Sequence, residues 1–112
     1  MSARLPSRVP KRAAVFAALG DETRLSMLSK LSSGQRYSIS QLTEGTRLTR
    51  QAVTKHLRVL ERACVVHAHP KGRERLFELD PRPLDDATRY LESVSTQWDA
   101  ALARLKSFVE DE

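Results

Sequence analysis

A seven-residue repeat in the last part of this 112-residue chain constrains its fold more than any other feature. Apolar residues occupy two heptad positions three residues apart: Leu84, Leu91, Trp98 and Leu105, then Ala87, Val94, Ala101 and Phe108. Four such heptads predict one long helix, over 83–110, with a narrow apolar seam. The chain has room for one small domain, whose remainder is too small to cover the seam. Because an exposed apolar stripe is costly, we expect a second copy to cover it in a two-fold dimer.

The same seam predicts which residues form the dimer interface. Its alanines alternate with large residues and therefore allow two helices to approach closely. A short first helix, ending at Leu19, is expected to pack against the seam and complete the contact. The expected interface residues are Phe16, Leu19, Leu84, Leu91, Val94, Trp98, Leu105 and Phe108.

Charge is distributed unevenly along the chain, whose net charge is +5. Residues 1–75 contain 15 Lys or Arg and 5 Asp or Glu, whereas residues 76–112 contain 4 and 9. A basic first part predicts an anionic partner, of which nucleic acid is the foremost candidate. No apolar run approaches the roughly 20 residues that a membrane span needs. The single cysteine excludes an internal disulfide framework and suits a reducing cytoplasm, where we expect the protein.

The basic N-terminus precedes an Ala-rich run, a combination that can mimic a secretory signal. The run stops at Gly20, and its removal would shrink an already small domain. We therefore interpret 1–12 as a basic flexible arm and 13–112 as one domain. Pro10 suits the opening of a first helix that ends at Leu19.

The next segments predict three more helices and a hairpin. Asp21 is a suitable N-cap for a second helix, in which Leu25, Met27, Leu28 and Leu31 should form one buried stripe. Residues 37–39 can form a strand fragment, and Ser40 is expected to cap a short helix over 41–44. Thr49 caps a helix from Arg50 to about Ala63 with a basic outer face. Strands over 65–69 and 75–79 should pair around a turn at 70–73, where Gly72 supplies a positive φ.

A short helix, a turn around Gly45 and a second helix form a helix-turn-helix arrangement, and the hairpin after it forms a wing. The predicted fold is mainly α with a small β-hairpin wing, a winged helix-turn-helix with a long C-terminal dimerisation helix. A major groove admits one helix, whose N-terminal side chains face the base edges. We therefore expect double-stranded DNA as the partner. The expected DNA-binding residues of this second helix and the wing are Thr49, Arg50, Gln51, Thr54, Lys55, His56, Arg58, Lys71, Arg73 and Arg75.

These residues divide by role. Arg50, Gln51, Thr54 and Lys55 lie in the first two turns and should read bases. Lys71, Arg73 and Arg75 on the hairpin suit phosphates or the minor groove, which gives affinity and salt dependence rather than sequence choice. His56 is a phosphate contact or a buried packing residue. The opposing interpretation of all these residues is a solvated helix face and a charged hairpin.

Three segments carry a resemblance to a known family: ALGDETRL at 18–25, LTRQAVTKHLRVLERA at 48–63 and GRERLFELD at 72–80. They resemble the ArsR family of bacterial winged-helix repressors, over about residues 13–108. The resemblance implies a dimeric repressor that leaves its operator when an effector arrives. By position, Arg24 resembles the family's Arg at the start of the second helix, which implies a phosphate or an intramolecular contact.

Two departures from the family bear on metals. Metal-sensing members often carry a Cys-x-Cys near the short helix, but 40–44 has no Cys or His. Others use Asp and His pairs on the last helix, which here has no His. Soft or borderline metals need such ligands, so we expect no metal and no cofactor. An alternative is a thiol- or metal-responsive regulator using Cys64, His67 and His69.

Cys64 stands where a glycine is expected after a helix end, since a positive φ strains a side chain by roughly 1 kcal/mol. Its thiol could be a sensor or a buried inert group. No spacing places a nucleophile beside a base, so we do not expect an enzyme. A second alternative to a DNA-binding regulator is a protein-interaction module that uses the heptad seam.

Overall fold

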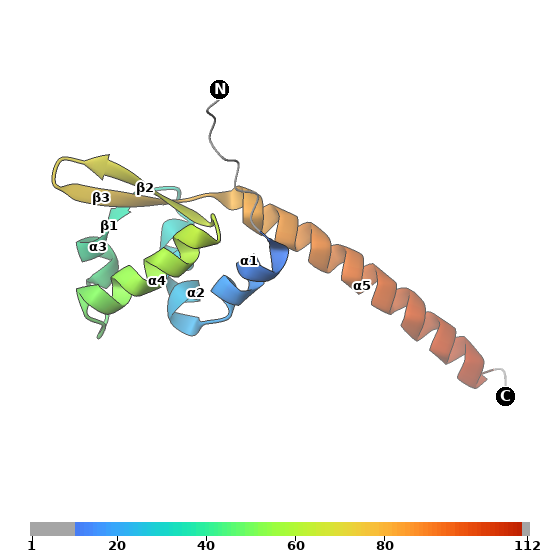
Figure 1. The fold of residues 1–112 in the computed structure, drawn as a ribbon. Coiled ribbons are helices and arrows are strands. Elements are labelled where there is room, and N and C mark those ends of the chain that lie inside the picture. Colours follow the sequence, from blue (N-terminus) through green and yellow to red (C-terminus); the bar gives the residue numbers. More distant parts are fainter. Residues whose placement is uncertain (1–10, 111–112) are drawn as a thin grey trace, which may run out of the picture.

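The computed structural model describes residues 11–110, which form five helices and a small three-stranded sheet within that range (Figure 1). The elements are α1 (Arg12–Leu19), α2 (Glu22–Leu31), β1 (Tyr37–Ser38), α3 (Ile39–Thr43), α4 (Arg50–Arg62), β2 (Val66–Lys71), β3 (Glu74–Leu79) and α5 (Pro81–Glu110). The predicted class, mainly helical with a small hairpin, is confirmed. Residues 1–10 of the expected basic arm lie outside the described residues, and Arg12 already begins α1.

The core forms where α1, α2 and α4 pack against one another and against the sheet. Its buried apolar residues are Val15, Ala18, Met27, Leu28, Leu31, Leu42, Val53, Leu57, Leu60, Ala63, Val65, Val66, Phe77 and Ala87. One predicted member of the α2 stripe is wrong, because Leu25 is 49% exposed. The buried face of α2 is centred near Leu31, and Leu25 lies about 120° away from it around the helix.

The start of α3 differs from the prediction. The helix is Ile39–Thr43, and its cap is Ser38 rather than Ser40. Ser38 Oγ accepts from the Gln41 backbone N–H (3.1 Å), and Gln41 Oε1 accepts from the Ser38 N–H (2.9 Å). This reciprocal pair needs a Ser and a Gln three residues apart, which Ser38 and Gln41 provide. The capping box therefore begins the helix two residues earlier than predicted.

The end of α4 confirms the expectation for Cys64, whose φ is +63°. The Cys64 N–H donates to Glu61 O (2.9 Å), and the Val65 N–H donates to Leu60 O (3.0 Å). These two bonds satisfy carbonyls at the helix end, and together they require Cys64 to adopt a left-handed conformation. Val65 is thereby placed in the core ahead of β2, rather than in the strand as predicted.

The sheet has the order β1-β3-β2, with both neighbouring pairs antiparallel. The hairpin register pairs Val66 with Leu79 and Lys71 with Glu74, so the turn contains only Gly72 and Arg73. Gly72 has the positive φ that was predicted, +61°. Tyr37 of β1 pairs with Phe77 of β3, which attaches the start of α3 to the hairpin.

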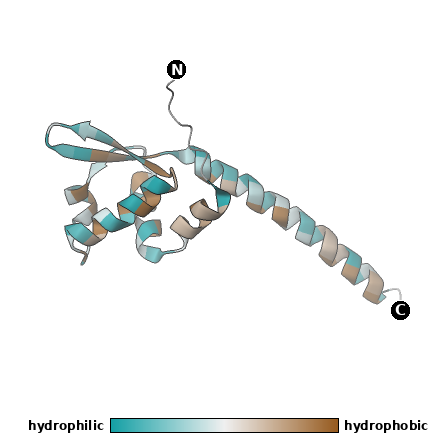
Figure 2. Ribbon diagram, viewed as in Figure 1, coloured by the Kyte–Doolittle hydropathy of each residue, from teal (hydrophilic) through white to brown (hydrophobic). Residues whose placement is uncertain are grey.

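The last helix, α5, leaves the rest of the domain and extends alone for most of its length (Figure 1). Its first turns pack on α1, where the Phe16 and Tyr90 ring centroids are 6.0 Å apart and Arg12 Nε lies 3.2 Å from Asp86 Oδ2. Beyond Tyr90 the seam is uncovered in this chain: Trp98 is 63% exposed and Phe108 70%. Figure 2 shows apolar segments recurring along this extension. Within 11–110, no helix is long and apolar enough to cross a membrane.

Candidate nucleic-acid interface

The helix-turn-helix consists of α3, the turn 44–49 and α4. Thr49 caps α4 as predicted, since its Oγ1 accepts from the Ala52 N–H (3.0 Å). Gly45, with φ +80°, reverses the chain between the two helices. The cap leaves other N–H groups of the first α4 turn open, and that turn contains no acidic residue. The N-terminus of α4 therefore favours an anion.

The outward face of α4 gathers the predicted base-reading side chains. Val53, Leu57 and Leu60 anchor the helix in the core, so the opposite face is turned to solvent. Exposed on this face are Arg50, Gln51, Lys55 and Arg58. Thr54 is half-buried, and its hydroxyl donates to Arg50 O (2.7 Å). The Thr54 oxygen can therefore only accept from a base, while its methyl group can contact one.

The hairpin carries its cations in two different settings. Lys71 and Arg73 stand exposed at the tip, which lies toward the same end of the molecule as the start of α4 (Figure 1). Arg75 is turned toward α4 instead: one of its Nη atoms lies 3.8 Å from Glu61 Oε2, and its guanidinium lies 5.9 Å from the Phe77 ring centroid. Arg75 therefore does not lie with Lys71 and Arg73 at the exposed tip, although the three were predicted to act together.

Arg24 and His56 lie in a network between helices. Arg24 Nε donates to Ala18 O (2.6 Å), one Nη to Ala17 O (3.3 Å) and the other to His56 Nδ1 (3.2 Å). Asp21 caps α2 by accepting from the Arg24 N–H (3.0 Å), a bond that holds the pKa of the Asp21 carboxyl below its ordinary value. Of the two roles expected for Arg24, the structure gives the intramolecular one. His56 is half-buried on the side of α4 that faces this network.

The possible metal cluster of Cys64, His67 and His69 does not form. His67 Nε2 lies 2.7 Å from Asp80 Oδ2, and His69 Nε2 lies 2.9 Å from Glu78 Oε1. Across the described part of the chain, no group of three or more His, Cys, Asp or Glu side chains could hold a metal ion. Each imidazole is instead hydrogen-bonded to a different carboxylate, from β3 or its end.

Asp80 joins the hairpin to α5, a role that the sequence did not predict. Its Oδ1 accepts from the Arg82 N–H (3.0 Å) and Arg82 Nε (2.9 Å), and its Oδ2 accepts from Arg82 Nη (2.6 Å) as well as from His67. The Arg82 hydrogen bonds, with that of His67, hold the pKa of this buried carboxyl far below its ordinary value. An Asp directly before a Pro at a helix start is an N-cap signal that could have identified it.

Arg47 is a second residue that sequence analysis missed. It is an exposed cation in the turn before α4, two residues from the Thr49 cap. Its place beside the N-terminus of α4 was the available signal. The turn thus adds a positive charge close to the N-terminus of α4.

Comparison with known proteins assigns the family. Residues 21–67, from the α2 cap into β2, match the family model described as bacterial regulatory protein, arsR family. Over 77 residues the chain is 39% identical to the uncharacterized HTH-type transcriptional regulator YuzN of Bacillus subtilis, covering 63% of this chain and 84% of YuzN. It is 36% identical to the HTH-type transcriptional regulator Rv2034 of Mycobacterium tuberculosis, covering 69% of each. The transcriptional repressor SdpR of B. subtilis is 27% identical, with 69% of this chain and 84% of SdpR covered.

Solved structures share the fold as well. An ArsR-like transcriptional regulator from Rhodococcus sp. RHA1 superimposes with a TM-score of 0.75 at 36% identity, over 87% of this chain and 91% of that one. The homodimeric winged helix-turn-helix domain of Mb0332 from Mycobacterium bovis has a TM-score of 0.57 at 22% identity, over 80% of each chain, and shares the fold. With the helix-turn-helix, the hairpin wing and the long last helix in place, the chain belongs to the ArsR family of bacterial winged helix-turn-helix transcriptional regulators.

Proposed function

We propose that this chain is a homodimeric repressor that binds an inverted-repeat DNA operator and leaves it when an effector binds. The observation that carries the proposal is the basic face of α4 and the hairpin tip at one end of a chain whose other end is an uncovered apolar helix. Its relatives are transcriptional regulators, which supports a regulator rather than an enzyme. The cytoplasm, where bacterial DNA is accessible, is the expected location.

In this proposal α4 lies in the major groove and selects the sequence. Arg50 has the geometry to donate to guanine O6 and N7, and Gln51 can pair with adenine N6 and N7. Both are exposed in the first turn, where a helix entering the groove meets the bases. Lys55 and Arg58 follow on the same exposed face. Thr49 contributes by capping the helix and leaving its N-terminus positive toward phosphates.

The hairpin tip supplies affinity that does not depend on sequence. Lys71 and Arg73 are exposed beside Gly72, in reach of a phosphate backbone next to the groove. Arg75 acts differently, because its guanidinium is directed toward Glu61 of α4 rather than toward the hairpin tip. Contacts of lysine or arginine with phosphates release counterions, so this part of the affinity falls with salt.

The dimer would form through α5, with α1 beside it. Within the described residues the seam carries four large side chains that are more than half exposed, Leu91, Trp98, Leu105 and Phe108, and Leu102 and Val109 add two more at its edge. A stripe of this extent on a lone helix favours a self-complementary contact with a second copy. The Mb0332 domain of the same fold is a homodimer, which supports this arrangement. Two-fold symmetry would then set two α4 helices about 34 Å, or 10 base pairs, apart.

Selection from a pool of random duplexes, followed by sequencing of the bound fragments, tests this function. The expected result is an inverted repeat whose half-sites have centres about 10 base pairs apart, bound by two chains. A selected sequence with a single half-site, or one chain per duplex at full affinity, would contradict the dimeric reading. Absence of any enriched sequence would favour the alternative of a protein-interaction module.

A further inference from the structure

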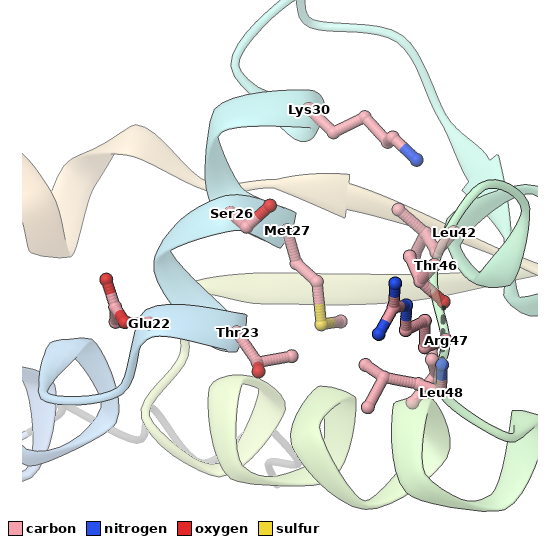
Figure 3. A pocket seen from close by; sticks show the side chains of 10 residues that line it. Glu22, Thr23, Ser26, Met27, Lys30, Leu42, Thr46, Arg47 and Leu48 are labelled. Carbon is pink, nitrogen blue, oxygen red and sulfur yellow. Dashed lines mark hydrogen bonds between the residues drawn. The ribbon is translucent and has the colours of Figure 1, made fainter.

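A pocket of about 390 Å³ lies between α2 and the turn that leads into α4 (Figure 3). Its volume falls within the range of about 300–1,000 Å³ that is usual for small-molecule sites. The α2 side is formed mainly by Thr23, Ser26, Met27 and Lys30, and the opposite side by Leu42, Arg47, Leu48 and Val53. The pocket therefore joins the domain core to the segment that begins α4.

The inner wall of this pocket is apolar. Met27 is 5% exposed, and Leu42 and Val53 are each 1% exposed, so they form a floor that water barely reaches. Figure 3 shows the Met27 thioether directed into the space between α2 and the turn. Leu48, which is half-buried, adds an apolar edge on the α4 side. An occupant with an apolar body would contact these groups and the carbon stems of the cations beside them.

Two cations border the same space. Figure 3 shows the Lys30 amine and the Arg47 guanidinium on the side of the pocket where Leu42 and Thr46 lie. For neither side chain does the described structure give a hydrogen bond or an ion pair. The one carboxylate of the lining, Glu22, lies at the far side of the pocket in this view. The apolar floor thus has two cations at one end, and this pairing favours an amphipathic anion.

We propose that this pocket binds a small carboxylic acid with an apolar body. The carboxylate would accept from the planar donors of Arg47 in a two-point contact and from Lys30 Nζ. The apolar body would lie against Met27 and Leu48.

A regulatory consequence follows, and it rests on the proposed DNA-binding function. Arg47 lies in the turn next to α4, where it would also meet the operator backbone. A carboxylate bound in the pocket and an operator phosphate offer Arg47 the same chemistry, so they compete for it. Such a carboxylate would therefore weaken operator binding, as an effector does.

The first experiment needs no DNA, so it is independent of the proposed function. Hexanoate is titrated into the full chain, and binding is followed by NMR of the Met27 and Leu48 methyl groups. The expected result is saturable shifts at both, at least tenfold weaker affinity in Arg47→Gln and Lys30→Gln, and no change in the matched control Lys106→Gln. Hexanol, which lacks the anion, and inorganic phosphate, which lacks the apolar body, should both bind more weakly than hexanoate.

Each of the following results of this titration would contradict the proposed carboxylate site. Shifts that do not saturate, or equal affinity in the Arg47 and Lys30 variants, would show that hexanoate does not use these cations. Equal binding of phosphate would reduce the site to an unspecific anion contact, and equal binding of hexanol would remove the role of the charge.

The second experiment measures operator affinity with and without saturating hexanoate. The expected result is at least a threefold loss for the wild-type chain. Ser26→Leu, which fills the pocket and keeps both cations, should bind the operator normally and lose the response to hexanoate. Operator affinity that does not respond in the wild type would overturn the regulatory step, whereas failure of the chain to bind DNA at all would overturn the proposed function and leave the pocket result intact.

Discussion

The Arg24 guanidinium lies 3.2 Å from His56 Nδ1 and so connects the start of α2 with the middle of α4. The same group donates to the carbonyls of Ala18 and Ala17 at the end of α1. A cation at that position also interacts favourably with the C-terminal dipole of α1. Because α1 packs on α5 through Phe16 and Tyr90, one side chain links the proposed dimer helices to the helix proposed to read DNA.

Replacement of Arg24 should affect both stability and DNA recognition. We expect Arg24→Ala to lower the free energy of unfolding by about 1–3 kcal/mol, since hydrogen bonds from a charged group to part-buried acceptors are lost. Operator affinity should fall more than affinity for random DNA, because the orientation of α4 is less well fixed. Denaturant unfolding and binding to both kinds of duplex measure these effects.

Arg36→Ala is the matched control for Arg24→Ala. The Arg36 ion pair with Glu78 (3.6 Å) lies at the surface, where such pairs contribute roughly 0–1 kcal/mol. If the two variants lost equal stability and kept the same ratio of operator to random-DNA affinity, the linking role of Arg24 would be excluded.

Substitutions on α4 and substitutions at the hairpin tip should have different effects in DNA-binding assays. Gln51→Ala and Arg50→Ala are each expected to cost about 1–3 kcal/mol at the selected operator and to relax discrimination at one base position. Lys71→Ala and Arg73→Ala should weaken all duplexes alike and reduce the salt dependence of binding by about one phosphate contact each. Titrations of operator variants at several salt concentrations distinguish the two patterns. An unchanged ranking of operator variants in Gln51→Ala would mean that α4 does not read the sequence.

Asp80 should make folding stability sensitive to acid. Its pKa is depressed in the folded chain, chiefly by the hydrogen bonds from Arg82, so the unfolded chain binds a proton more readily. The stability that this carboxylate contributes is therefore present at neutral pH and is lost as the pH falls from about 5 downward. Asp80→Asn should show a weaker loss of stability over this range, as measured by urea unfolding at several pH values.

Asp80→Ala distinguishes the contribution of the backbone cap from that of the negative charge. It removes the acceptor of the Arg82 N–H as well, so we expect a further loss of about 1 kcal/mol relative to Asp80→Asn at neutral pH. Asp85→Asn, which changes an exposed acid one turn later on α5, is the control. A wild-type pH dependence retained in Asp80→Asn would assign the acid sensitivity to other carboxylates.

Charges on the α5 seam should abolish the dimer and operator binding together. In the double variant Leu91→Glu, Trp98→Glu, the proposed contact with the partner helix would have to bury two carboxylates, so we expect monomers by light scattering. Thr96→Glu, Ala103→Glu adds the same charge on the opposite side of the helix and should remain dimeric. A seam variant that stays dimeric, or a wild-type monomer with full operator affinity, would contradict the proposed assembly.

The sequence by itself determined the elements whose cause is local. Thr49 caps α4 because a Thr hydroxyl reaches the N–H three residues on, and Gly72 forms the hairpin turn because it adopts a positive φ without strain. Cys64 could be predicted to be left-handed from the helix end alone. The heptad seam likewise predicted α5, since helical periodicity needs no knowledge of the rest of the fold.

Only the tertiary structure decided which distant side chains meet. Arg24 and His56 are 32 positions apart, and His67 and Asp80 are 13 apart. Their pairing depends on how α2 crosses α4 and on the β2–β3 register, which local patterns leave undetermined. The exposure of Leu25 has the same origin, because an apolar residue at the edge of a helical face is buried only if a neighbouring element reaches it. Periodicity and capping are properties of a few consecutive residues, whereas hydrogen-bond partners and burial are set by the packing of whole elements.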